Sequence, residues 1–157
     1  MQDGERMLCE AAAIVEHLCH AHAGGRMTVE PGAANHYDYD YDYLYWIGLN
    51  DNVLRLFFTP AGPGRQTEWV LAAMFQRREA GYARMIEMAL VASPYLAGAQ
   101  LTCADIMATY CLRSPRMQRA RGDMLNAAAD LARIAARPAY QRAMAIAEAD
   151  AELPAAS

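Results

Sequence analysis

Hydrophobic positions recur with helical spacing through most of the chain, and this pattern predicts a mainly α-helical protein. The longest amphipathic stretch runs from Gln66 to about Ala92, where Ser93-Pro94 ends it. An almost wholly apolar stretch follows at 103–112. A helix that is apolar all round is typical of a buried element, so we expect this one at the centre of the fold.

The start of this central helix carries a capping signal. Thr102 and Asp105 stand three residues apart immediately before the apolar run, with Leu101 and Ile106 in the positions of a hydrophobic staple. In a capping box the Thr102 hydroxyl faces the backbone N–H of Asp105, and the Asp105 carboxylate accepts from the N–H of Thr102. We therefore predict a structural N-cap at these two residues.

Weaker signals flank these elements. A short extended stretch at 5–8 precedes a helix from Glu10 to about His22, which Gly24-Gly25 ends. The side chains expected on the inner face of that helix are Ala13, Ile14, His17 and Leu18.

Two more helices are expected near the carboxyl end of the chain. One runs from Asp123 to Ala136, and the other from Pro138 to about Glu148. The residues of the first helix expected to face inward are Met124, Ala128, Leu131 and Ile134 or Ala135.

The segment 37–43 alternates tyrosine and aspartate, which by itself favours a strand. Helical spacing nevertheless continues from Tyr37 through Tyr41 to Leu56, and Thr59-Pro60 supplies a stop, so we predict a long helix. Its tyrosines favour packing or an interface over a substrate pocket. The interleaved aspartates lack the glycine and distal glutamate of a calcium loop, and they favour a solvated face.

Composition adds limits on function. The 157 residues carry a net charge of −4, which argues against a nucleic-acid surface and gives no membrane attraction. The sequence contains no apolar run of transmembrane length and no leader pattern. The four cysteines have no CxxC spacing and are expected to be buried thiols in a reducing cytoplasm: Cys9, Cys19, Cys103 and Cys111.

Two polar clusters are candidate sites. His17 and His20, three apart and close to Cys19 and His22, could share a ligand, but the set does not match a structural zinc spacing, so no metal is expected. A basic patch without interleaved aromatics is expected to be a solvated loop: Arg113, Arg116, Arg119 and Arg121.

Three stretches resemble the glutathione transferase family. Residues 95–106 are similar to the capped core helix of its C-terminal domain, residues 8–15 to its strand-to-helix junction, and residues 133–143 to its closing segment. Residues 43–46 look like part of its fourth helix. The resemblance implies a glutathione transferase C-terminal-like helical bundle at 24–157, preceded at 1–23 by a remnant of a thioredoxin-like α/β domain, namely its last strand and helix.

The resemblance also implies a function: conjugation of glutathione to hydrophobic electrophiles in a cytoplasmic homodimer. The family's junction grips the γ-glutamyl end of glutathione, which assigns Glu10 and Ala11 to glutathione binding, although Ala11 replaces the family's serine. Polar and aromatic positions of the predicted long helix are assigned to the electrophile: Tyr41, Tyr45, Asn52 and Arg55.

The family's catalytic residue lies in a segment that this chain does not match. We therefore expect an N-terminally truncated chain with no catalytic residue and no transferase activity of its own. The alternative is a non-catalytic helical module for dimerisation or partner binding. Saturable glutathione binding distinguishes the two hypotheses, because only the transferase hypothesis requires it.

Overall fold

The computed structural model of the protein describes residues 1–39, 65–113, 117–118 and 122–151, and this part of the chain is mainly helical, as the periodicity predicts. Its helices are α1 (Ala11–Ala23), α3 (Arg65–Ala92), α4 (Cys103–Leu112), α6 (Leu125–Ala135) and α7 (Pro138–Ala151). Their bounds lie within a few residues of those expected. Within these residues no helix combines the length and apolar character needed to cross a bilayer.

A small antiparallel sheet precedes α1. Strand β1 (Gln2–Asp3) pairs with β2 (Arg6–Met7), and Asp3 lies opposite Arg6. Gly4 has a φ of 59°, the positive value that a two-residue hairpin loop requires at its first position. The sequence pattern indicated only one extended stretch here, because a two-residue strand is too short to show alternation.

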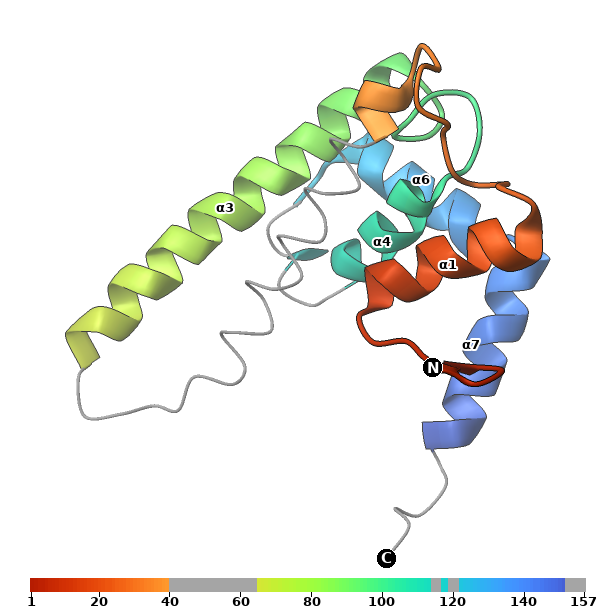
Figure 1. The fold of residues 1–157 in the computed structure, drawn as a ribbon. Helices are drawn as coiled ribbons and strands as arrows, with labels where there is room; N and C mark the ends of the chain where they lie inside the picture. Colours follow the sequence, from red (N-terminus) through yellow and green to blue (C-terminus); the bar gives the residue numbers. More distant parts are fainter. Residues whose placement is uncertain (40–64, 114–116, 119–121, 152–157) are drawn as a thin grey trace, which may run out of the picture.

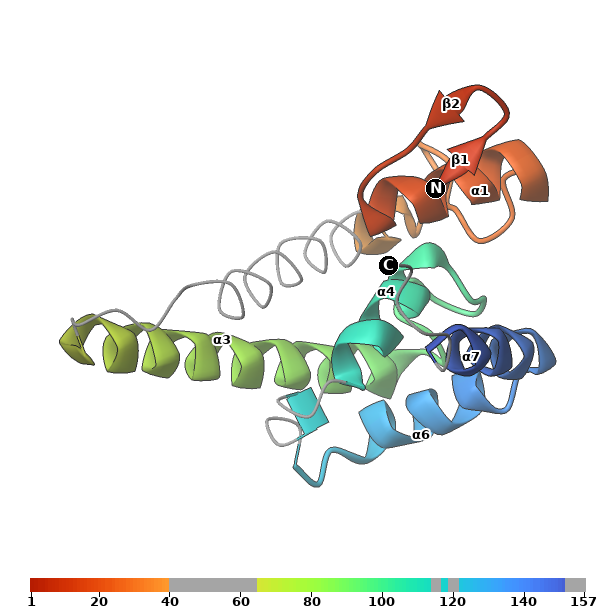
Figure 2. The ribbon, with the colours of Figure 1, turned by 90° about the horizontal axis from the view of Figure 1, so that it is seen from below.

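Helix α4 lies between α1 and α6, and α3 runs out well beyond the other described helices (Figures 1 and 2). Eight of the ten residues of α4 are buried: Cys103, Ala104, Asp105, Met107, Ala108, Thr109, Cys111 and Leu112. The central position expected of this apolar helix is therefore observed, and its small side chains allow neighbouring helices to approach closely.

Helix α1 packs on α4 through a different face from the one expected. Cys19 is buried, and Ala12 and Val15 pack against the core, whereas Ala13 and Leu18 are exposed. The predicted inner face was therefore wrong for Ala13 and Leu18, whereas its other two residues, Ile14 and His17, are half-buried. Apolar residues cover much of the circumference of α1, so periodicity alone did not select the side that meets α4.

Helix α6 packs on α3 and α4, and its buried residues are Ala127, Asp130 and Ile134. Ile134 was expected inside, and Met124 and Leu131 are partly buried against the core, but Ala135 is exposed. The burial of Asp130 was missed because a carboxylate is rarely buried without a partner, so sequence reasoning assigns it to the surface.

Residues 36–39 are helical, which agrees with a helix rather than a strand at the start of the tyrosine–aspartate run. Tyr37, the first of the helically spaced residues, is 75% exposed, whereas Tyr39 is buried. The rest of the predicted long helix lies outside the described residues.

Candidate functional site

The start of α1 is the first candidate site, because it contains both residues assigned to glutathione. The helix begins at Ala11, and Glu10 is its N-cap rather than its first helical residue. Both residues are exposed. The carbonyl of Glu10 accepts the first helical hydrogen bond from the N–H of Ile14 at 3.0 Å, while the Glu10 side chain makes no capping hydrogen bond. The start of a helix is an environment that favours anions, because backbone N–H groups and the positive end of the helix dipole lie there.

Glu10 has a strained backbone, with φ 70° and ψ 122°. Among the described residues, Met27 is the other non-glycine residue with positive φ, and its carbonyl accepts the N–H of Cys103 at 2.8 Å. The conformation of Met27 thus completes the start of the central helix. Glu10 makes no such contact with the core, and strain of this kind concentrates at functional sites.

The residues assigned to the electrophile, Tyr41, Tyr45, Asn52 and Arg55, lie outside the described residues. Their assignment remains a prediction.

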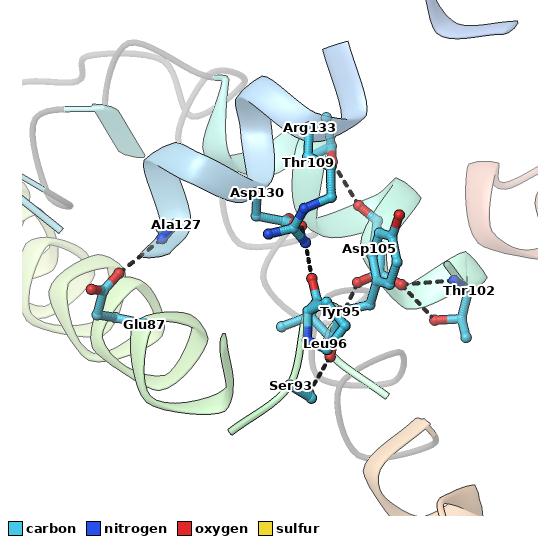
Figure 3. A network of polar contacts seen from close by, with 11 residues as sticks. Glu87, Ser93, Tyr95, Leu96, Thr102, Asp105, Thr109, Ala127, Asp130 and Arg133 are labelled. Atoms are coloured by element: carbon cyan, nitrogen blue, oxygen red, sulfur yellow. Dashed lines mark hydrogen bonds and ion pairs between the residues drawn. The ribbon is translucent and has the colours of Figure 1, made fainter. Parts of the chain in front are cut away.

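A buried polar network surrounds the predicted cap of α4 (Figure 3). Thr102 and Asp105 form the capping box. The Asp105 carboxylate accepts from the N–H of Thr102 at 2.7 Å, from the Thr102 hydroxyl at 2.9 Å and from the N–H of Leu96 at 2.8 Å. Asp105 is completely buried, and burial raises its pKa against the lowering effect of these bonds.

The same network continues into α6. Burial and the charge of Asp105 raise the pKa of Asp130 to about 6. The Arg133 guanidinium, 3.2 Å from the Asp130 carboxylate, partly offsets this rise. Arg133 also donates to the carbonyl of Pro94, and its guanidinium lies 5.2 Å from the centre of the Tyr95 ring. These contacts join α6 to the loop before α4, so we interpret the network as structural.

Glu87, a residue of α3, caps the N-terminal end of the separate helix α6. Its carboxylate accepts from the N–H groups of Asn126 and Ala127 at 3.1 and 2.9 Å and from the Asn126 side chain at 2.9 Å. Burial works against ionisation, but these hydrogen bonds hold the pKa of Glu87 below its usual value. Nothing in the local sequence of α6 indicates this cap, because its donor and acceptor are about 40 residues apart.

An open hollow of about 470 Å³ lies among α4, α6 and α7. Its polar wall includes Arg113, which donates to the Tyr140 hydroxyl and whose guanidinium lies 5.6 Å from the centre of that ring. The hollow is lined by Thr109, Arg113, Leu131, Ala132, Ala135, Tyr140, Met144 and Glu148. The interpretation of Arg113 as a solvated side chain was incomplete. The other arginines of that basic patch lie outside the described residues.

The cysteines divide into two kinds. Cys9 is exposed, which corrects the expectation that all four are buried. The Sγ atoms of Cys19 and Cys103 lie 3.2 Å apart between α1 and α4. Burial and the neighbouring Cys19 raise the pKa of the Cys103 thiol to about 12, and burial does the same for Cys111. These two thiols are protonated at neutral pH and poorly reactive.

The structure also rearranges the histidine cluster. His17 and His22 both lie within hydrogen-bond distance of the Asp3 carboxylate, while His20 is exposed and takes no part. The pair weighed from the sequence, His17 and His20, is therefore not the one that the fold brings together. Sequence reasoning missed Asp3 because the hairpin, not the helix, supplies it.

Comparison of the chain with protein-family models, with curated proteins and with solved structures finds no match.

Proposed function

We propose that the protein is glutathione transferase-like and binds glutathione at the start of α1, with Glu10 and Ala11 as the site residues. The observation that carries this proposal is the strained backbone of the exposed Glu10 at the start of α1. The order of the first elements, an antiparallel hairpin followed by a helix, supports it, because the thioredoxin-like domain of that family ends in the same order.

The chemistry of the site suits the γ-glutamyl end of glutathione. A helix start favours the carboxylate of that group, because backbone N–H groups and the helix dipole both face it. The Glu10 carboxylate offers an acceptor for the ammonium group next to that carboxylate. On this proposal the protein works in the cytoplasm, where glutathione keeps thiols reduced. The helical domain contributes a wall for a hydrophobic electrophile, and the thiolate chemistry is not assigned to any residue of this chain.

Calorimetric titration with reduced glutathione tests the proposal. We expect saturable binding by the wild-type protein and a loss of at least tenfold in affinity for Glu10→Gln, which keeps the shape of the side chain but removes the charge. Glu16→Gln is the matched control, because Glu16 is exposed on the same helix. No binding by the wild-type protein, or equal losses in both variants, would overturn the proposal.

Ala11→Ser provides a gain-of-function test. The substitution restores the hydroxyl that the family resemblance implies at this position, and one hydrogen bond to a charged group contributes about 1.5–3 kcal/mol. We therefore expect glutathione to bind about tenfold more tightly or better. An unchanged affinity of Ala11→Ser for glutathione would indicate that glutathione does not bind at this helix start.

The second candidate is a non-catalytic module for dimerisation or partner binding. Exposed apolar side chains one turn apart on α3 favour it, since Met88 is 64% and Val91 is 74% exposed. Light scattering over a range of protein concentrations tests it: we expect a dimer that Val91→Asp dissociates. A monomer at all concentrations would contradict dimerisation, and saturable glutathione binding would decide for the first candidate, because only that candidate requires it.

A further inference from the structure

We propose that Asp3, His17 and His22 form a binding site for a divalent transition-metal ion, with Zn²⁺ as the ion expected. One carboxylate oxygen and one nitrogen from each ring lie within 4.8 Å of one another. Imidazole nitrogen and carboxylate oxygen are ligands that zinc prefers, and three such protein ligands leave a fourth position for water. This inference is independent of glutathione binding.

The geometry is close to that of a coordinated ion. The Nε2 atoms of His17 and His22 lie 2.8 and 2.9 Å from the same Asp3 oxygen, Oδ2. Two ligand atoms about 2.1 Å from a tetrahedral zinc ion lie roughly 3.4 Å apart, so each of these two nitrogen–oxygen distances has to increase by about half an ångström. Side-chain rotation alone can provide that change.

The backbone holds the three ligands from two directions. His17 is at the middle of α1 and His22 is in its last turn, where Gly24, with φ 61°, and the hydrogen bond from the Gly25 N–H to the Cys19 carbonyl at 2.9 Å fix the end of the helix. Asp3 comes from the β1–β2 hairpin, which the positive φ of Gly4 closes. The hairpin also joins its ends through two bonds between Met1 and Leu8, of 2.8 and 2.9 Å.

The site is accessible without being fully solvated. The His17 side chain is 21% exposed and the Asp3 side chain 33%, while His22, at 53%, forms the outer wall. The centres of the His17 and His22 rings are 6.0 Å apart, and the angle between the ring planes is 76°. A metal ion can therefore enter from the His22 side and reach the partly buried His17 nitrogen.

The consequence for the fold is a tie between the hairpin and α1. A hairpin with two residues in each strand is marginally stable alone. An ion held by Asp3 and both histidines binds only when the hairpin lies against α1, so binding stabilises that arrangement. We therefore expect metal to raise the melting temperature as well as to bind.

The experiment is a titration of ZnCl₂ into EDTA-treated, dialysed protein without a histidine tag, at a fixed pH of about 7.5, because metal affinity depends on pH. We expect one Zn²⁺ per chain and a higher melting temperature. His17→Ala, His22→Ala and Asp3→Asn should each weaken binding by at least about tenfold, since even residues behind the ligands contribute that much. Co²⁺ in place of Zn²⁺ should give a visible absorption band that the three variants lose.

Two controls separate this site from other zinc ligands of the chain. His20→Ala removes an exposed histidine of the same helix, and Cys9→Ser removes the exposed thiol, so neither should change binding. Asp3→Asn keeps the side-chain shape and tests the site even if His17→Ala disturbs packing, which circular dichroism would reveal. Absence of zinc binding, affinity unchanged by the three ligand variants, or affinity lost with either control would overturn the proposal.

Discussion

The surroundings of α4 and the segment formed by the hairpin and α1 use polar residues in opposite ways. Around α4 the polar groups are buried and saturated: the Asp105 carboxylate has three donors, and Thr109 donates to the Asp105 carbonyl at 2.7 Å. In the N-terminal segment the polar groups are accessible, and Glu10 is strained and does not cap α1 with its side chain. Saturated buried polar groups stabilise a fold, whereas accessible strained ones are available to ligands.

The largest expected effect is at Asp105. Asp105→Ala leaves three buried donors without an acceptor, at about 1 kcal/mol or more for each, so we expect the free energy of unfolding to fall by about 3 kcal/mol or more. Urea denaturation measures this change. Asp123→Ala, at an exposed turn residue, should change stability by less than about 0.5 kcal/mol. Similar values for the two variants would contradict the structural role of the network.

The next effect concerns pH. The pKa of Asp130 is raised from 3.8 to about 6, so the folded protein holds this proton more tightly than the unfolded chain. The stability that this group contributes is complete below about pH 4 and is lost as pH rises through 6. Between pH 4 and 7 the wild-type protein should therefore lose about 2 kcal/mol relative to Asp130→Asn, in paired urea titrations. Parallel pH profiles would show that Asp130 is not perturbed.

Thr102→Ala should cost about 1–2 kcal/mol, the upper part of the range for a helix N-cap, because this cap is buried. Thr102→Ser keeps the hydroxyl and should retain most of the stability. Thermal melts of the three proteins measure the difference. A melting temperature unchanged in Thr102→Ala would remove the argument that this capped helix is central.

The smallest effect has the opposite sign. Glycine accepts the φ of Glu10 without strain, so Glu10→Gly should raise stability by about 0.5 kcal/mol after the entropy cost of glycine is subtracted. Ala13→Gly, at an exposed interior position of α1, should lower it by about 1 kcal/mol. Thermal melts compare the two, and a loss of stability in Glu10→Gly would show that Glu10 is not strained.

Sequence patterns predicted correctly the features that depend on residues close together along the chain. The spacing of Thr102 and Asp105 predicts a capping box because both of its hydrogen bonds join residues three apart. The bounds of α3, expected from Gln66 to about Ala92 and observed as Arg65–Ala92, follow from a periodic pattern ended by a proline. Pro138 likewise begins α7, since its fixed φ suits a first helical position.

The residues that sequence reasoning missed are joined over long distances along the chain. The candidate metal site needs Asp3 next to histidines 14 and 19 residues away, and the cap of α6 needs Glu87. Periodicity also left the rotation of α1 undecided, because apolar residues lie on several of its sides. The burial of Asp130 depends on the helices around it, which its neighbours in sequence do not reveal.

The sequence by itself determined the helical class of this protein, the extents of its described helices and the cap of its central helix, because each depends on contacts within a few residues. Only the tertiary structure decided which face of each helix is buried, which carboxylates are saturated and which remain accessible. The physical reason is that burial and hydrogen bonding between elements depend on how those elements meet in space, and the candidate metal site at the hairpin and α1 was defined only at that level.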